Sequence, residues 1–217
     1  MSENITTENL EVEQIEDDPI EVRRAKRETM LAEGKNPYGH AFDYSHHIDE
    51  LEAKYAELAD GVTTEDEVKI AGRVMAKRDQ GKIVFLELRD ATADIQLFCR
   101  INTLGEDMFA ELKDLDVGDW IGAEGVMMRT RRGQLSVAVT LFELLSKSLR
   151  PLPEKFHGLA DKETRYRQRY VDLVMNPEVR STFENRFKII SAIRSYMESQ
   201  SFYEVETPML HPILGGA

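Results

Sequence analysis

Three side chains on a pair of alternating segments could contact a nucleic acid. Phe85 lies in the segment IVFLELR, and Gln96 and Phe98 lie in the segment DIQLFC, each between apolar neighbours. An aromatic ring can stack on an unpaired base, and an amide can read a base edge through its donor and its acceptor. Arg78 lies just before these segments, where a guanidinium could hold a phosphate or stack on a base. Together these residues predict a surface that binds nucleic acid.

Alternation of apolar and polar residues predicts the strands that would carry this surface. One parity of the third strand holds Ile95, Leu97 and Cys99, which we assign to a core, so that Gln96 and Phe98 face outward. The turn residues between the alternating segments separate five strands, and a helix is expected between the third and the fourth. Three strands, a helix and two strands is the order of the OB-fold, the oligonucleotide-binding barrel, so we predict an α+β, mainly β, chain built around it. The expected strands are residues 67–77, 83–89, 94–101, 120–128 and 134–144, with the helix at 105–113.

The predicted face leaves two questions open. Phe85 and Phe98 could instead pack beneath a loop or a helix, as aromatic residues on barrels often do. Arg78 has the parity of Ile70 and Val74, so it joins the outer face only if a bulge or the end of the strand shifts the register.

The charge distribution allows a nucleic-acid partner although the net charge is −12. Seven acidic residues and no basic residue precede Pro19, whereas residues 68–101 carry an excess of three positive charges. A local basic surface can hold a phosphate backbone, because ions screen the distant acidic tail.

The segment before the barrel divides into a tail and a helical arm. Residues 1–17 are too polar and too acidic to bury a core, and we predict that they are disordered. Asp18 and Pro19 suit the start of a helix over residues 20–33, and a second helix is expected over 48–58, so that residues 18–66 form the arm. The first helix carries four basic residues that either face solvent or touch an RNA backbone; they are Arg23, Arg24, Lys26 and Arg27, and we expect the three arginines to make the backbone contacts.

Several classes of site are not supported by the composition. Cys99 is the single cysteine, which permits no disulfide within one chain, and the five scattered histidines give no metal-ligand spacing. No apolar run is long enough for a membrane span, and the polar N-terminus does not look like a signal peptide. We therefore expect a cytoplasmic protein without a metal site.

The composition changes after the barrel, which we bound at residues 67–147. Residues 148–176 form a predicted linker that begins with a proline-rich stretch and contains an arginine-rich helix at 161–175. A long helix follows at 177–200, with an apolar stripe at helical spacing, and a strand is expected at 202–206. One helix and one strand cannot cover their own apolar faces, so another chain or further sequence must do so.

Three stretches together resemble one family over residues 19–217. RPLPEKFHGLADKETRYRQRYVDL resembles the segment between the anticodon-binding and catalytic domains of bacterial-type class II (IIb) lysyl-tRNA synthetases. FYEVETPMLHPILGGA is similar to their class II motif 1, and GKIVFLELRD followed by DIQLFC is similar to their anticodon-binding face. The resemblance implies an N-terminal portion of a lysine–tRNA ligase, the enzyme that attaches lysine to tRNA-Lys with ATP.

The resemblance also implies roles for the residues of the barrel. Phe85 would stack on an anticodon base, Gln96 would read a base edge, and Arg78 would support the bases or the backbone. Phe98 belongs to the same face. Many relatives have a glutamate where this chain has Gln134, which keeps the hydrogen bonding but removes a charge, so we expect Gln134 to be a weaker contact.

The C-terminal part would form the start of a class II catalytic domain over residues 177–217. Motif 1 would build a homodimer through Phe187, Ile190 and Pro208. Gly215 and Gly216 resemble the edge of the loop that enters the amino-acid pocket.

Motifs 2 and 3, which hold ATP, Mg²⁺ and lysine in this family, would lie beyond Ala217. We therefore expect no catalytic residue and no bound cofactor in this chain, which alone should be inactive, and neither a membrane nor DNA as a partner. Three alternatives stay open: an aspartyl- or asparaginyl-type class IIb synthetase, a free-standing OB-fold RNA-binding module, and a protein-interaction barrel.

Overall fold

The structure is a computed structural model that describes residues 18–39, 41–153, 159 and 161–209. These residues belong to two compact units, Met1–Leu152 and Pro153–Ala217. Residues 1–17, for which disorder is predicted, lie outside the described residues, as do Gly215 and Gly216.

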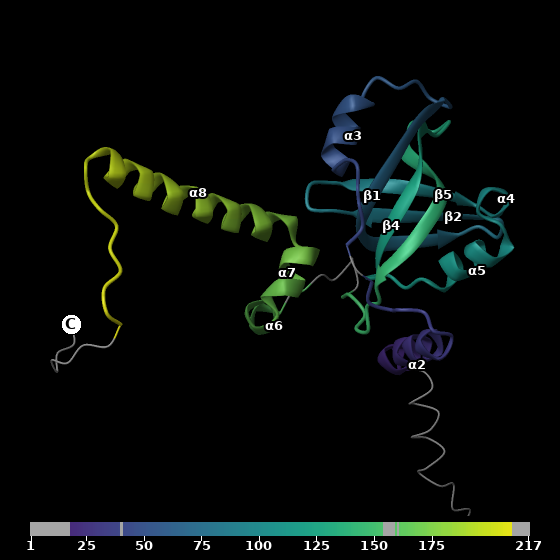
Figure 1. Ribbon diagram of the computed structural model, residues 1–217, viewed down its shortest axis with the longest axis horizontal. Helices are drawn as coiled ribbons and strands as arrows, with labels where there is room; N and C mark the ends of the chain where they lie inside the picture. Colours follow the sequence, from purple (N-terminus) through teal and green to yellow (C-terminus); the bar gives the residue numbers. More distant parts are fainter. Residues whose placement is uncertain (1–17, 40, 154–158, 160, 210–217) are drawn as a thin grey trace, which may run out of the picture. The chain divides into compact units, whose positions relative to one another are not determined.

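The first unit contains a closed five-stranded barrel, which confirms the predicted fold (Figure 1). The strands follow the order β1-β2-β3-β5-β4 around the barrel. All neighbours are antiparallel except β3 and β5, whose parallel pairing closes the barrel. The elements of the barrel are β1 (Thr63–Asp79), β2 (Ile83–Arg89), β3 (Asp94–Arg100), α4 (Ile101–Leu104), α5 (Glu106–Asp114), β4 (Trp120–Arg129) and β5 (Leu135–Ser146).

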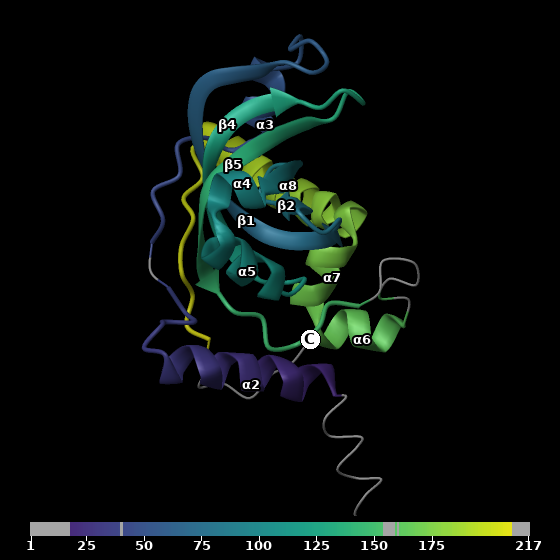
Figure 2. The same ribbon diagram turned by 90° about the vertical axis from the view of Figure 1, so that its right-hand side faces the viewer.

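Alternating burial along the strands places one parity in a single core. In β2 the residues Val84, Leu86 and Leu88 are buried, and Phe85 between them is half-buried. Helix α3 (Ile48–Lys54) adds apolar side chains to this core, as does α5, and the two helices lie on different sides of the barrel in Figures 1 and 2. Helix α3 is shorter than predicted, and β1 begins before the expected residue 67.

Helix α2 (Pro19–Ala32) begins as the sequence predicts. The Asp18 carboxylate accepts a hydrogen bond from the backbone N–H of Ile20 at 2.9 Å, and Pro19 occupies the first turn. The helix lies outside the barrel, close to the chain that leaves β5 (Figure 2). A cleft of about 690 Å³ separates α2 from α5 and β5.

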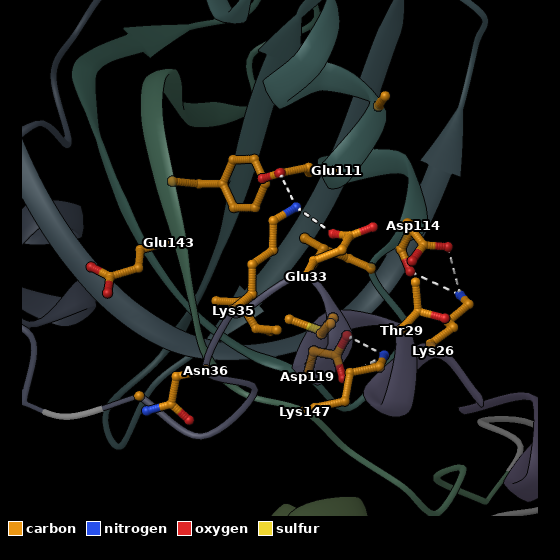
Figure 3. A pocket seen from close by; sticks show the side chains of 16 residues that line it. Lys26, Thr29, Glu33, Lys35, Asn36, Glu111, Asp114, Asp119, Glu143 and Lys147 are labelled. Atoms are coloured by element: carbon orange, nitrogen blue, oxygen red, sulfur yellow. Dashed lines mark hydrogen bonds and ion pairs between the residues drawn. The ribbon is translucent and has the colours of Figure 1, made fainter. Parts of the chain in front are cut away.

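Ion pairs connect α2 to the barrel beside this cleft, and Figure 3 shows Lys26 paired with Asp114 and Lys147 paired with Asp119. The Lys147 ammonium, which is 5% exposed, donates to the fully buried carboxylate of Asp119 at 2.8 Å and also pairs with Asp116. Asp116 in turn accepts from the Lys26 ammonium of α2 at 3.1 Å. Burial of unpaired charges is costly, so Lys147 and the two aspartates depend on one another, and Lys26 extends the network to α2.

The described residues of the second unit form three helices. The predicted arginine-rich helix is broken at Gln168 into α6 (Lys162–Arg167) and α7 (Arg169–Met175), and α8 (Pro177–Ser199) follows. The buried Asp172 carboxylate of α7 accepts hydrogen bonds from Arg165 of α6 at 2.8 Å and from Asn176 at 2.6 Å. The first of these bonds connects the two helices across the break.

The prediction of a strand at residues 202–206 is wrong, because this segment is extended but unpaired. A strand needs a neighbour for its backbone groups, and the described part of this unit contains only helices besides this segment.

The single cysteine should be unreactive in the folded chain. Burial raises the pKa of the Cys99 thiol to about 12. The thiolate is the reactive form, so at pH 8 we expect labelling by a disulfide reagent to be roughly a thousandfold slower in the native chain than in denaturant. Stopped-flow absorbance measures both rates, and equal rates would contradict the buried position.

The ion network should make stability depend on pH through Asp116. Desolvation opposes ionisation of this carboxyl, but the hydrogen bond and charge of Lys147, with help from Lys26, hold its pKa below the usual value. A lowered pKa stabilises the folded chain above the pKa of the unfolded state, about 4, and this contribution is lost as the pH falls through the folded-state value. We therefore expect Asp116→Asn to lower the free energy of unfolding by roughly 1–3 kcal/mol at pH 7.

The free energy of unfolding, measured in urea at pH 7 and at pH 3, checks this prediction. The control is Glu57→Gln, which removes one negative charge at an exposed position. The difference between Asp116→Asn and the parent chain should narrow at the lower pH. A difference of the same size at both values would show that Asp116 does not act through its charge.

Candidate nucleic-acid interface

Strand pairing brings the predicted outer residues of the barrel together. Phe85 of β2 pairs with Phe98 of β3, and their ring centroids lie 5.3 Å apart. Arg78 of β1 pairs with Phe85 from the other side, and its guanidinium lies 6.0 Å from the centre of that ring. Arg100 lies 5.3 Å from the Phe98 ring. Two half-buried rings, each beside a guanidinium, therefore form one continuous surface on β1, β2 and β3.

A bulge in β1 resolves the parity of Arg78. The register between β1 and β2 shifts between Val74 and Ala76, so that Val74 and Met75 are both buried. The extra residue moves Arg78 from the core parity to the outer face. The sequence indicated that such a shift was required but not where it occurs.

Hydrogen bonds connect the outer face across three strands. The Arg78 guanidinium donates to the Gln96 amide oxygen at 3.3 Å, and the Gln96 amide nitrogen donates to the Ser136 hydroxyl at 3.0 Å. That hydroxyl donates to the backbone carbonyl of Gln134 at 3.2 Å. The Gln96 amide is therefore held in one orientation, with its oxygen towards Arg78.

Ser136 is a member of this surface that the sequence analysis missed. It is fully buried and comes opposite Gln96 through the parallel pairing of β3 with β5. Its only sequence signal is a polar residue on the outward parity of the fifth strand, which is also what a solvent-exposed serine would show.

A hollow of about 250 Å³ lies next to Arg78 and Gln96 on this face of the barrel. Its lining combines a guanidinium, two amides and two carboxylates, a set that offers both donors and acceptors to a base edge. The carboxylate of Asp94 pairs with Arg89 at 2.5 Å, and this hydrogen bond raises the pKa of that guanidinium. The lining residues are Arg78, Glu87, Asp94, Ile95, Gln96 and Gln134.

The basic residues of α2 are divided between two roles. Arg23 is only 8% exposed, and its guanidinium donates to the backbone carbonyls of Val117 at 3.0 Å and of Arg150 at 3.2 Å. This position differs from the expected contact with an RNA backbone, because the side chain holds α2 to the barrel instead. Arg24 and Arg27 pair with the α2 carboxylates of Glu21 and Glu28 near the helix surface.

Two of the three predicted dimer residues lie on an apolar face of α8. Phe187 is 63% exposed and Ile190 is 37% exposed within this chain. Pro208 lies in the extended segment that follows the helix, and Gly215 and Gly216 lie outside the described residues. In the part of the chain that the structure describes, no cluster of histidine, cysteine or acidic residues could hold a metal ion. None of the helices within the described ranges is long and apolar enough to span a membrane.

Comparison with known families gives the two units separate matches. Residues 68–145 match the model of the OB-fold nucleic acid binding domain. Residues 161–217 match the model of the class II tRNA synthetases for D, K and N, which are aspartate, lysine and asparagine. The two matches define a class II aminoacyl-tRNA synthetase sequence with an OB-fold before it, which argues against a free-standing RNA-binding module or a protein-interaction barrel.

Several curated relatives that the chain resembles are lysine–tRNA ligases. The chain is 53% identical over 193 residues to a lysine–tRNA ligase of Dehalococcoides mccartyi, covering 88% of this chain and 39% of the relative. It is 47% identical over 198 residues to that of Carboxydothermus hydrogenoformans, covering 91% and 40%. For Oceanobacillus iheyensis the identity is 48% over 200 residues, covering 91% and 41%.

The chain is thus similar to lysine–tRNA ligases over about nine tenths of its own length. It spans about two fifths of the length of the curated relatives that it matches. The resemblance to lysyl-tRNA synthetases is thereby confirmed over the aspartyl- and asparaginyl-type alternative.

Proposed function

We propose that the outer face of β1, β2 and β3 binds the anticodon of tRNA-Lys, as part of a lysine–tRNA ligase. The observation that carries the proposal is the pair of half-buried rings, Phe85 and Phe98, on the same face as a hollow with a fixed amide. In this arrangement an anticodon base stacks on Phe85, and the Gln96 amide reads the edge of a neighbouring base. Arg78 supports both through its hydrogen bond to Gln96, and Gln134 adds a weaker contact from the rim.

A contact of α2 with the tRNA backbone forms part of the same proposal, but only through Arg24 and Arg27. Their guanidinium groups are near the surface and pair with Glu21 and Glu28 of the same helix, and Arg27 has a further hydrogen bond with Tyr38. Such exposed ion pairs are weak and can be exchanged for phosphate contacts at little cost. Arg23 is excluded because the barrel already occupies it.

The full-length protein would attach lysine to tRNA-Lys with ATP and Mg²⁺. These cofactors supply the activation of the lysine carboxylate, and we assign no residue of this chain to hold them. We also propose a cytoplasmic location, which the single buried cysteine suits.

A homodimer is a further part of the proposal, with a second copy of α8 as the partner. The exposed apolar side chains along α8 are Phe187, Ile189, Ile190, Ile193, Tyr196 and Met197. A helix face of this kind is stable in water when it is covered, and a two-fold axis would let the same stripe cover itself.

Truncation of Phe85 should weaken the binding of an anticodon stem-loop. We expect the 217-residue chain to bind a stem-loop with a U-rich anticodon more tightly than one with a scrambled loop. Phe85→Ala should reduce the affinity by roughly 1–3 kcal/mol, because one stacking contact is lost. Fluorescence anisotropy measures these affinities.

The matched control is Tyr44→Ala, which removes an exposed aromatic ring of the same unit outside the proposed face. It should leave the affinity unchanged. Equal binding of both loops by the parent chain, or equal losses for the two variants, would refute an anticodon-reading face.

A charge on the apolar stripe of α8 should prevent dimer formation. We expect the parent chain to sediment as a dimer and Ile193→Glu to sediment as a monomer, since a desolvated carboxylate at the interface is costly. Lys188→Glu introduces the same group on the opposite side of the helix and should remain dimeric. A parent chain that is monomeric at micromolar concentration would contradict this part of the proposal.

A further inference from the structure

The hairpin between β4 and β5 presents two arginines beside the proposed RNA face. Arg131 and Arg132 are exposed at its tip, and neither side chain has a hydrogen bond or ion pair with another residue of the described chain. The next residues lead into Gln134, which lines the hollow. The tip therefore places two uncommitted positive charges at the edge of a surface that would hold a negatively charged RNA.

The tip itself is a tightly hydrogen-bonded turn. The backbone N–H of Gly133 donates to the carbonyl of Thr130, and the N–H of Thr130 donates to the carbonyl of Gln134, both at 2.9 Å. Gly133 has φ +83°, a conformation that glycine adopts without strain. The turn thus has a defined shape, but these bonds do not determine where it points relative to the barrel.

Arg129 determines that direction from the base of the hairpin. One guanidinium nitrogen donates to the carbonyl of Gly133 at 2.8 Å. The other donates to the carbonyls of Tyr55 at 3.0 Å and Ala56 at 2.9 Å, at the C-terminal end of α3. One side chain therefore joins the far side of the turn to the helical arm that precedes the barrel.

The backbone reinforces this connection. The N–H of Gly61 donates to the carbonyl of Arg129, and the N–H of Arg129 donates to the carbonyl of Val62, both at 2.9 Å. The β4–β5 hairpin thus runs beside the segment between α3 and β1, as Figure 2 shows. The C-terminal end of a helix attracts a cation. The planar Arg129 guanidinium also donates to three carbonyls at once, a geometry that a lysine ammonium does not reproduce.

We propose that Arg129 is a positioning residue for RNA binding: it fixes the hairpin against α3 so that Arg131 and Arg132 contact phosphates of the bound RNA. This inference rests on the proposed function. It also gives the arm a role, because α3 then braces the basic tip without touching the RNA.

The test compares the salt dependence of stem-loop binding among variants of the full chain. Arg131→Ala with Arg132→Ala should lower the slope of log affinity against log salt by about 1.4, which corresponds to two phosphate contacts with a single strand. Arg129→Lys keeps the positive charge but loses the planar guanidinium that reaches three carbonyls. This variant should show a similar decrease in slope and roughly a tenfold loss of affinity at 0.1 M salt. In the double-alanine background, Arg129→Lys should cause no further loss.

The control is Arg73→Lys, which alters another guanidinium that donates to a backbone carbonyl of the barrel, that of Gly118 at 3.0 Å. This variant should leave the slope unchanged. A merely structural role for Arg129 would lower affinity by the same factor in both backgrounds, and that result would overturn the inference.

Two further outcomes distinguish a failure of this inference from a failure of the variant to fold and from a failure of the proposed function. If Arg129→Lys fails to fold, an unchanged slope in the double-alanine variant alone would still overturn the inference, because the tip would then contact no phosphate. If the parent chain does not bind the stem-loop at all, the proposed function itself fails. Binding by the parent chain with an unaffected slope in the double-alanine variant removes only the inference.

Discussion

The parallel pairing of β3 with β5 is the constraint on which the first unit depends. It closes the sheet, so that none of the five strands leaves an open edge. It also sets the register that places Ser136 opposite Gln96, and the hydroxyl of Ser136 then holds the Gln96 amide. A slip of one residue would turn the outward side chains of β5 into the core and break this contact. The stability of the barrel and the orientation of its candidate reading group thus have the same origin.

Much of the barrel could be predicted from the sequence, because alternating burial leaves a local signature. The two-residue period placed Phe85 and Phe98 on the outer parity, and the structure shows their rings adjacent. The bulge at Met75 could not be located, since an extra residue in a strand changes the pairing without changing the composition. Ser136 could not be found either, because its partner is about forty residues away in the sequence and approaches by a parallel pairing that no local pattern records.

Errors occurred where a residue type has two physical uses. Arginines on a helix indicate an RNA contact or a solvated surface, but Arg23 instead occupies backbone carbonyls next to the barrel, where few other side chains could satisfy several acceptors. The segment at residues 202–206 has strand-forming residues but no neighbouring strand among the described residues of its unit. In both cases tertiary contacts, or their absence, decide the outcome, and single-chain patterns do not contain that information.

The long first strand has a consequence for biosynthesis. β1 pairs with β2 on one side and with β4 on the other, so half of its backbone partners are made only after residue 120. The ring contacts of Phe85 and Phe98 need only the early strands, but closure needs β5, and the ion network needs Lys147 just after it. On a translating ribosome the sheet therefore cannot close until β5 has emerged, and the ion network forms only after Lys147 follows it. Any chaperone that attends the nascent chain would meet an open, three-stranded sheet with its apolar side uncovered.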